Sequence, residues 1–184
     1  ANVRGLPRPT HGVVVHAQSC MEPISFRPDG TIAEVEMTTQ GVGGPMSPLL
    51  RMEASRACLM SGNLWTTVRR PPHDTPVEYL TGIRNNDCAY WKYYDFNLAD
   101  VNHFICKTWD KNTEARIEIR IDSPDGPLLG VCPVAATQGN LAYAIHETDI
   151  KPVRGKHALV LVFKGEEGKD LMNLEWFTFT RRKQ

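Results

Sequence analysis

The chain alternates short runs of Val, Ile, Thr, Tyr, Phe and Trp with turn-forming residues, and the runs recur about every 8 to 14 residues. Apolar residues at the spacing of an amphipathic helix are almost absent. This pattern is typical of all-β proteins and predicts a β-sandwich. The predicted strands cover residues 12–17, 31–38, 50–57, 63–69, 88–94, 101–108, 115–121, 142–146, 157–163 and 174–180.

The clearest strand lies at residues 116–121 (RIEIRI), where charged and apolar side chains alternate without a break. Since successive side chains of a strand point to opposite faces, the isoleucines should face a core and the charges water. Residues 123–126 (SPDG) follow and predict a turn, because Pro presets φ and Gly permits a positive φ.

A break in composition falls at residues 41–48 (GVGGPMSP), where regular structure is improbable. We place a boundary there, between a short piece at residues 1–47 and a domain at residues 48–184. The short piece holds too few strands for a core of its own, so it must pack on a neighbour. Residues 71–76 (PPHDTP) predict a surface loop, because proline cannot donate to a sheet.

Charge and composition limit the classes of ligand. Lys plus Arg and Asp plus Glu both number 21, so the formal net charge is zero, and we expect neither a nucleic-acid nor a membrane partner. No apolar run approaches the roughly 18 to 20 residues of a membrane helix. The start of the chain lacks both Met and a secretory leader, so we expect a fragment or mature segment of a secreted or periplasmic protein.

The five cysteines are odd in number and widely spaced, without a C-x-x-C pair. Small buried thiols are the ordinary interpretation of such residues, and a disulfide stays open. They are Cys20, Cys58, Cys88, Cys106 and Cys132.

Two sets of motifs, taken together, resemble a known enzyme architecture. The first set resembles the end of the propeller of a family 43 glycoside hydrolase and comprises residues 9–12 (PTHG), 19–24 (SCMEPI), 29–32 (DGTI) and 34–41 (EVEMTTQG). The second resembles a family 6 carbohydrate-binding module and comprises residues 93–96 (YYDF), 117–124 (IEIRIDSP), 155–157 (GKH), 161–165 (LVFKG) and 173–177 (NLEWF). The resemblance implies a jelly-roll β-sandwich with a short N-terminal β appendage.

The resemblance also implies that this chain is not itself an enzyme but part of a larger hydrolase of β-xylosidase or α-arabinofuranosidase type. Inverting glycosidases need two carboxylates on a scaffold that holds both. The appendage offers only Glu22, Asp29, Glu34 and Glu36, for which a solvated surface is the better interpretation. It also has Pro7 beside Arg8, where such hydrolases often carry His.

In family 6 modules a Tyr and a Trp sandwich a sugar in a cleft at one end, and an Asn hydrogen-bonds to it. Asn173 matches that Asn, whereas Gly82 and Asn140 stand at the Tyr and Trp positions. Tyr79 and Tyr143 lie near enough in sequence to substitute, although ordinary strand packing is the more frequent explanation of such residues.

Trp91 belongs to an aromatic strand at residues 90–94 (YWKYY). Alternation should place Trp91 and Tyr93 on one face of this strand, and Tyr90, Lys92 and Tyr94 on the other. One face should be core, and the other a possible second platform for a sugar. We assign Trp65, Trp109 and Trp176 to the core or to strand edges.

Family 6 modules often hold a structural calcium ion, and Glu53 and Glu175 match its carboxylate ligands. Ser55 stands where a second Glu is usual, and Glu175 where Asp is usual.

Three hypotheses about function follow. In the first, the chain binds a plant cell-wall polysaccharide such as xylan or arabinoxylan and keeps a covalently linked hydrolase near its substrate. In the second, the sugar site is lost and the sandwich packs on, or completes, the hydrolase. In the third, a loop of the module lines the hydrolase active site.

Overall fold

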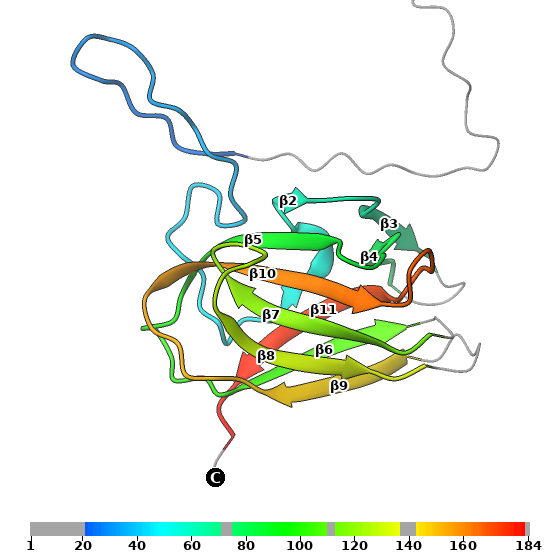
Figure 1. Ribbon diagram of the computed structural model, residues 1–184. Helices are drawn as coiled ribbons and strands as arrows, with labels where there is room; N and C mark the ends of the chain where they lie inside the picture. The colour runs from blue at the N-terminus through cyan, green and yellow to red at the C-terminus, as the bar shows by residue number, and fades with distance from the viewer. Residues whose placement is uncertain (1–20, 71–74, 110–112, 137–142, 183–184) are drawn as a thin grey trace, which may run out of the picture.

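In the computed structural model, which describes residues 21–70, 75–109, 113–136 and 143–182, two antiparallel sheets pack face to face (Figure 1). The six-stranded sheet has the order β3-β4-β11-β6-β9, with β1 also paired to β11. Its strands are β1 (Met52–Glu53), β3 (Trp65–Arg69), β4 (Val77–Thr81), β6 (His103–Trp109), β9 (Tyr143–Asp149) and β11 (Asn173–Thr180).

The five-stranded sheet has the order β2-β5-β10-β7-β8. Its strands are β2 (Leu59–Met60), β5 (Cys88–Asp95), β7 (Ala115–Ile121), β8 (Leu128–Val134) and β10 (Lys156–Gly165). From β4 onward the chain passes repeatedly from one sheet to the other, and the predicted jelly-roll sandwich is confirmed. Within the described residues, the one helix is the 3-10 turn η1 (Ala54–Arg56), and no helix is long and apolar enough to cross a membrane.

Alternating side chains build the core between the sheets. Ile117, Ile119 and Ile121 of β7 are buried, as the alternation of charged and apolar residues predicts, and the turn after β7 closes with a bond from Gly126 N to Ser123 O at 2.9 Å. Aromatic rings fill the middle of the sandwich, where Trp91 meets Phe177 edge to face at 4.8 Å between ring centroids. Cys88, Cys106 and Cys132 are buried, and the four described cysteines are free thiols.

Some predicted strands differ from the observed ones. Strands β4 and β8 were not predicted, because prolines precede β4 and β8 contains Gly130 and Pro133. Pro133 is tolerated because β8 is an edge strand, where one side needs no donor. Residues 31–38 form no strand beyond an isolated bridge between Phe26 and Ile32. The predicted strand at residues 12–17, like Cys20, lies outside the described residues.

The prediction that β5 alternates regularly was wrong. Trp91 and Tyr94 both point into the core and are fully buried, although three positions separate them. The register against β10 shifts between His157 and Leu159, so that two residues of β5 oppose one of β10. Such a bulge resets the alternation of a strand. A buried ring cannot stack on a sugar, so Trp91 is a core residue and not a platform.

Residues 21–47 extend from the sandwich and are fastened to β5 (Figure 1). The backbone N–H groups of Thr39 and Gln40 donate to Lys92 O at 2.6 and 3.0 Å. Glu36 accepts from Lys92 Nζ and Tyr93 Oη, both at 2.6 Å. These donors lower the pKa of Glu36, and the same carboxylate raises the pKa of Tyr93 to about 12.

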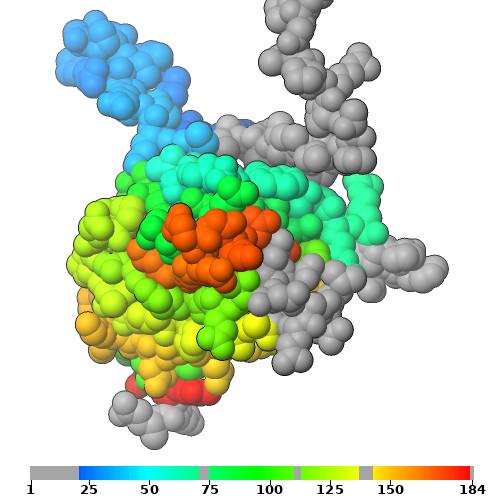
Figure 2. Space-filling view, turned by 45° about the vertical axis from the view of Figure 1, so that its right-hand side comes forward, coloured from blue at the N-terminus to red at the C-terminus, as the bar shows by residue number. Residues whose placement is uncertain are grey.

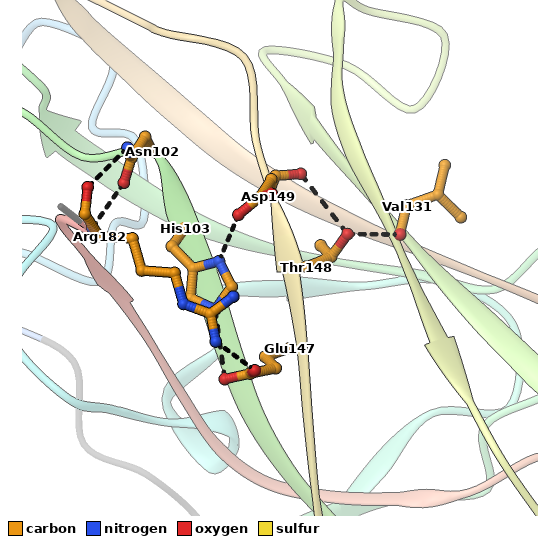
Figure 3. A network of polar contacts seen from close by, with 7 residues as sticks. All are labelled: Asn102, His103, Val131, Glu147, Thr148, Asp149 and Arg182. Atoms are coloured by element: carbon orange, nitrogen blue, oxygen red, sulfur yellow. Dashed lines mark hydrogen bonds and ion pairs between the residues drawn. The ribbon is translucent and has the colours of Figure 1, made fainter. Parts of the chain in front are cut away.

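A polar network fastens the end of β11, shown in Figure 3. Buried His103 contacts Asp149 through Nδ1 at 2.8 Å and Glu147 through Nε2 at 3.3 Å. Arg182 pairs with Glu147 at 2.5 Å and exchanges two hydrogen bonds with Asn102. The donors from His103 and Arg182 hold the pKa of Glu147 below its ordinary value.

We expect Trp91→Ala to reduce the free energy of unfolding by about 3–5 kcal/mol, because it opens a cavity against Phe177. Urea titration followed by circular dichroism measures this loss. Leu98→Ala is the matched control, since Leu98 is 60% exposed and should change stability by no more than about 0.5 kcal/mol. A Trp91→Ala variant of unchanged stability would contradict the core assignment.

Candidate functional site

One row of side chains crosses the outer face of the six-stranded sheet at the end where β11 begins. The β10–β11 connection, orange in Figure 2, lies at the same end of the sandwich. Strand pairing places these residues side by side, each on a different strand, from β3 at one edge to β9 at the other. The row comprises Trp65, Thr81, Asn173, Trp109 and Tyr143. It combines aromatic rings with one side-chain amide, the groups that recognise a sugar.

Asn173 begins β11 and is held from one side. Thr81 Oγ1 donates to Asn173 Oδ1 at 2.6 Å, so the amide is oriented with Nδ2 as its donor. The residue is 5% exposed. A fixed amide at the end of a strand gives a defined hydrogen-bond direction. Only a small part of the Asn173 surface is open to a ligand.

Trp65 occupies the space beside Gly82 that a side chain at position 82 would need. A Cβ atom added to Gly82 would lie 2.9 Å from both Cδ1 and Nε1 of the indole, and 2.4 Å from Asn63 O. Trp65 is 40% exposed and is the register partner of Thr81. Gly82 stands at the position where the sequence analysis expected a Tyr. The Trp65 indole of the neighbouring strand β3 lies against that position instead.

Tyr79, Trp109 and Tyr143 form an aromatic cluster beside Asn173. Tyr79 meets Trp109 edge to face at 4.6 Å, and Trp109 lies 6.0 Å from Tyr143 between ring centroids. Tyr143 is 42% exposed, whereas Trp109 is buried beneath its neighbours. The structure thus brings Tyr79, Tyr143 and Asn173 together on one sheet face, as needed if they serve one site.

The other predicted site residues lie elsewhere. Trp91 is in the core, and Asn140 lies outside the described residues. On the outer face of β5, Tyr93 is covered by Glu36 and by Lys156, whose Nζ lies 4.4 Å from the ring centroid. A second platform on that sheet would therefore have to displace the N-terminal segment.

The carboxylates of the N-terminal segment make structural contacts. Glu22 accepts from Thr38 N at 2.6 Å, and Asp29 accepts from Thr31 N at 2.9 Å, which closes a turn. Glu36 anchors the segment to β5. Their interactions are those of local folding and provide no paired acid and base.

The carboxylates predicted to bind calcium do not fit a metal ion as they are placed. Glu53 pairs with Arg51 at 3.0 Å. Buried Glu175 accepts from Lys107 Nζ at 3.1 Å through Oε1, lies 3.0 Å from the same ammonium through Oε2, and lies 3.9 Å from Arg51. Cationic side chains thus take the positions of a divalent ion, and the described residues gather no group of three His, Cys, Asp or Glu side chains that could hold one.

Sequence analysis missed Trp65 and Trp109 as site residues and assigned both to the core or to strand edges. In β3 the side chains of Trp65, Thr67 and Arg69 share one face, and the alternation around Val68 was the available signal that this face lies outside the core. Nothing in the sequence indicated that pairing with β4 would place the indole over Gly82.

The sequence matches the model of the carbohydrate binding module (family 6) over residues 66–181. An arabinoxylan arabinofuranohydrolase of Paenibacillus polymyxa is 33% identical over 156 residues, which are 83% of this chain and 24% of that protein. One of Bacillus subtilis is 28% identical, over 84% of this chain and 30% of that protein. The chain thus spans about a quarter to a third of these relatives.

Solved structures share the fold. A family 6 module from Clostridium cellulolyticum, in complex with xylose, has a TM-score of 0.64 and 34% identity, covering 74% of this chain and all of that one. The Bacillus subtilis family 43 arabinoxylan arabinofuranohydrolase, in complex with cellotetraose, has a TM-score of 0.69 and 28% identity, covering 88% of this chain and 33% of that one. A module in complex with calcium and xylotriose, 13% identical with a TM-score of 0.52, shares the fold alone.

We expect Gly82→Ala to cost about 1–3 kcal/mol more than Gly168→Ala, measured by urea titration. Both glycines have a positive φ, +69° and +73°, so both substitutions introduce similar backbone strain. Only at position 82 does the new Cβ collide with neighbours. Equal losses would show that Trp65 does not crowd Gly82.

We also expect the melting temperature to be the same in excess EDTA and in millimolar calcium, because Lys107 and Arg51 already neutralise Glu175. Lys107→Met should cost about 2–4 kcal/mol, since it leaves a buried carboxylate without its ammonium. Arg116→Met, which breaks an exposed contact with Glu118 at 3.9 Å, is the control. A drop of several degrees in EDTA for the unmodified chain would contradict this assignment.

Proposed function

This chain belongs to the family 6 carbohydrate-binding modules, and from that membership we propose that it binds the xylan backbone of plant cell-wall polysaccharides without catalysis. The relatives' names support this ligand class. The Clostridium cellulolyticum module, 34% identical, was solved with xylose, and two of the curated relatives are arabinoxylan arabinofuranohydrolases.

The observation that carries the proposal is that the exposed Trp65 indole and the oriented amide of Asn173 lie in one row on the outer sheet face, with Thr81 between them. A xylose ring presents an apolar face of C–H groups and a rim of hydroxyls. The exposed indole offers the stacking surface, and Asn173 Nδ2 the hydrogen bond, with Thr81 fixing the amide between them. Tyr143, exposed at the opposite edge of the row, extends the aromatic surface for a second sugar unit.

The second part of the proposal is that the chain serves a covalently linked hydrolase of β-xylosidase or α-arabinofuranosidase type. The relatives are three to four times longer than the part matched here. Residues 21–42 expose apolar side chains, which suits a segment that packs on a preceding domain. These are Met21, Ile24, Phe26, Ile32, Val35, Met37 and Val42.

Residues 1–47 then form the end of the hydrolase and its linker, and residues 48–184 the binding module. Tethering raises the local concentration of polysaccharide at the active site. Since such polysaccharides lie outside the cell, we place the whole protein in the secreted or periplasmic space.

The alternative is a module that has lost its sugar site and only buttresses the hydrolase. The near-complete burial of Asn173 and the absence of a side chain at Gly82 favour it. Binding measurements separate the two functions, because a buttress has no affinity for xylan.

We expect isothermal titration calorimetry to detect binding of xylohexaose to this chain, and Trp65→Ala to weaken it about tenfold, or about 1.4 kcal/mol. Trp176→Ala is the control, because Trp176 lies under Arg51 and pairs with Lys107, outside the row that contains Trp65 and Asn173. Absence of binding by the unmodified chain supports the buttress. Binding that Trp65→Ala leaves unchanged would place the site elsewhere.

A glycosidase assay completes the set. The isolated chain should release no xylose or arabinose from arabinoxylan, and release by the chain alone would contradict a non-catalytic role.

A further inference from the structure

Arg69, the last residue of β3, reaches across the whole outer face of the six-stranded sheet. Its Nη1 donates to Tyr143 Oη of β9 at 3.1 Å, although β3 and β9 are the two edge strands and three strands lie between them. Its guanidinium lies 5.0 Å from the ring centroid of Trp109 and 5.8 Å from that of Tyr143. The sheet must therefore curve toward this face, since the contact brings side chains of its two edge strands together.

The charge of Arg69 is not neutralised by the described part of the chain. Arg84, Arg154 and Arg182 each pair with a carboxylate, whereas no carboxylate of the described residues contacts the Arg69 guanidinium. The neighbouring ammonium of Lys107, 3.7 Å from the Tyr143 ring centroid, is matched by Glu175. Among the described residues, one positive charge therefore stays without a carboxylate partner beside the row of site residues.

Hydrogen-bond donors also exceed acceptors around Arg69. The guanidinium has five N–H donors, and Tyr143 accepts one of them. Trp109, which is 6% exposed, keeps its indole N–H without an acceptor among the described residues. A ligand that suits these surroundings supplies acceptors and negative charge.

The guanidinium is also preorganised. Stacking on Trp109 and the bond to Tyr143 restrict its rotamers, so less conformational entropy is lost when a ligand binds. A planar guanidinium matches a carboxylate with two parallel hydrogen bonds, and neutral sugar hydroxyls offer no such match.

We propose that Arg69 determines specificity by binding the carboxylate of a uronic acid substituent, so that the ligand of this module is an acidic, uronic acid-substituted xylan. This inference rests on the proposed function, because it assigns a side group to the polysaccharide bound at Trp65 and Asn173. Arg69 lies close to this sugar site, because Trp109 is both the register partner of Asn173 and the ring beneath the Arg69 guanidinium.

The test compares glucuronoxylan with the same polymer after chemical reduction of its carboxyl groups to alcohols. Affinity electrophoresis or calorimetry in about 20 mM NaCl should show at least fivefold tighter binding of the acidic polymer. The preference should disappear in about 500 mM NaCl, where the Debye length falls to a few ångströms.

Arg69→Met should bind both polymers equally and should keep the unmodified chain's affinity for the reduced one. Arg70→Met, which removes the exposed neighbouring charge, is the matched control and should keep the preference. Tyr143→Phe, which removes the hydroxyl that orients Arg69, should lower the preference without abolishing it. Melting curves confirm that each variant is folded.

Equal binding of both polymers by the unmodified chain overturns the inference and leaves the proposed function standing. A preference that persists in Arg69→Met overturns it as well. Binding of neither polymer by the unmodified chain overturns the proposed function, and the inference with it.

Discussion

The edge-to-face contact between Trp91 of β5 and Phe177 of β11 joins the two sheets near their middle. Phe177 continues to Phe104 at 5.8 Å and to Phe179 at 6.3 Å, so the rings form one continuous layer. Because β11 must keep Phe177 and Leu174 in this layer, Asn173 is turned to the outer face. The candidate site therefore lies on the outer face of a strand whose inner face builds the core.

The fold class followed from the alternation of apolar and polar residues, and the limits of β7 were predicted without error. Alternation failed where strands carry bulges. In β5 the buried pair is Trp91 and Tyr94, and in β11 the register shifts between Leu174 and Trp176, so that inward residues lie three positions apart. A bulge depends on the partner strand, and a period-two pattern in one strand cannot reveal it.

The candidate site was predictable only in part. Asn173, Tyr79 and Tyr143 were identified from motif positions and do lie on one face. Trp65 and Arg69 were missed because their surroundings depend on what lies across the sheet. The indole lies against Gly82, directly after β4, and the guanidinium reaches Tyr143 of β9. The sequence also did not reveal that Lys107, on the neighbouring strand β6, contacts Glu175, a predicted calcium ligand.

Because the Trp65 indole lies against Gly82, positions 65 and 82 cannot both carry a large side chain. A ring fits on β3 or at the end of β4, but not on both, because each would occupy the same volume. A single substitution at either position would therefore give a chain with two colliding rings or with no ring at this place. Chains of this lineage should therefore exchange the two residues together, and the pair should serve as a marker that separates this branch from modules that keep the aromatic residue on β4.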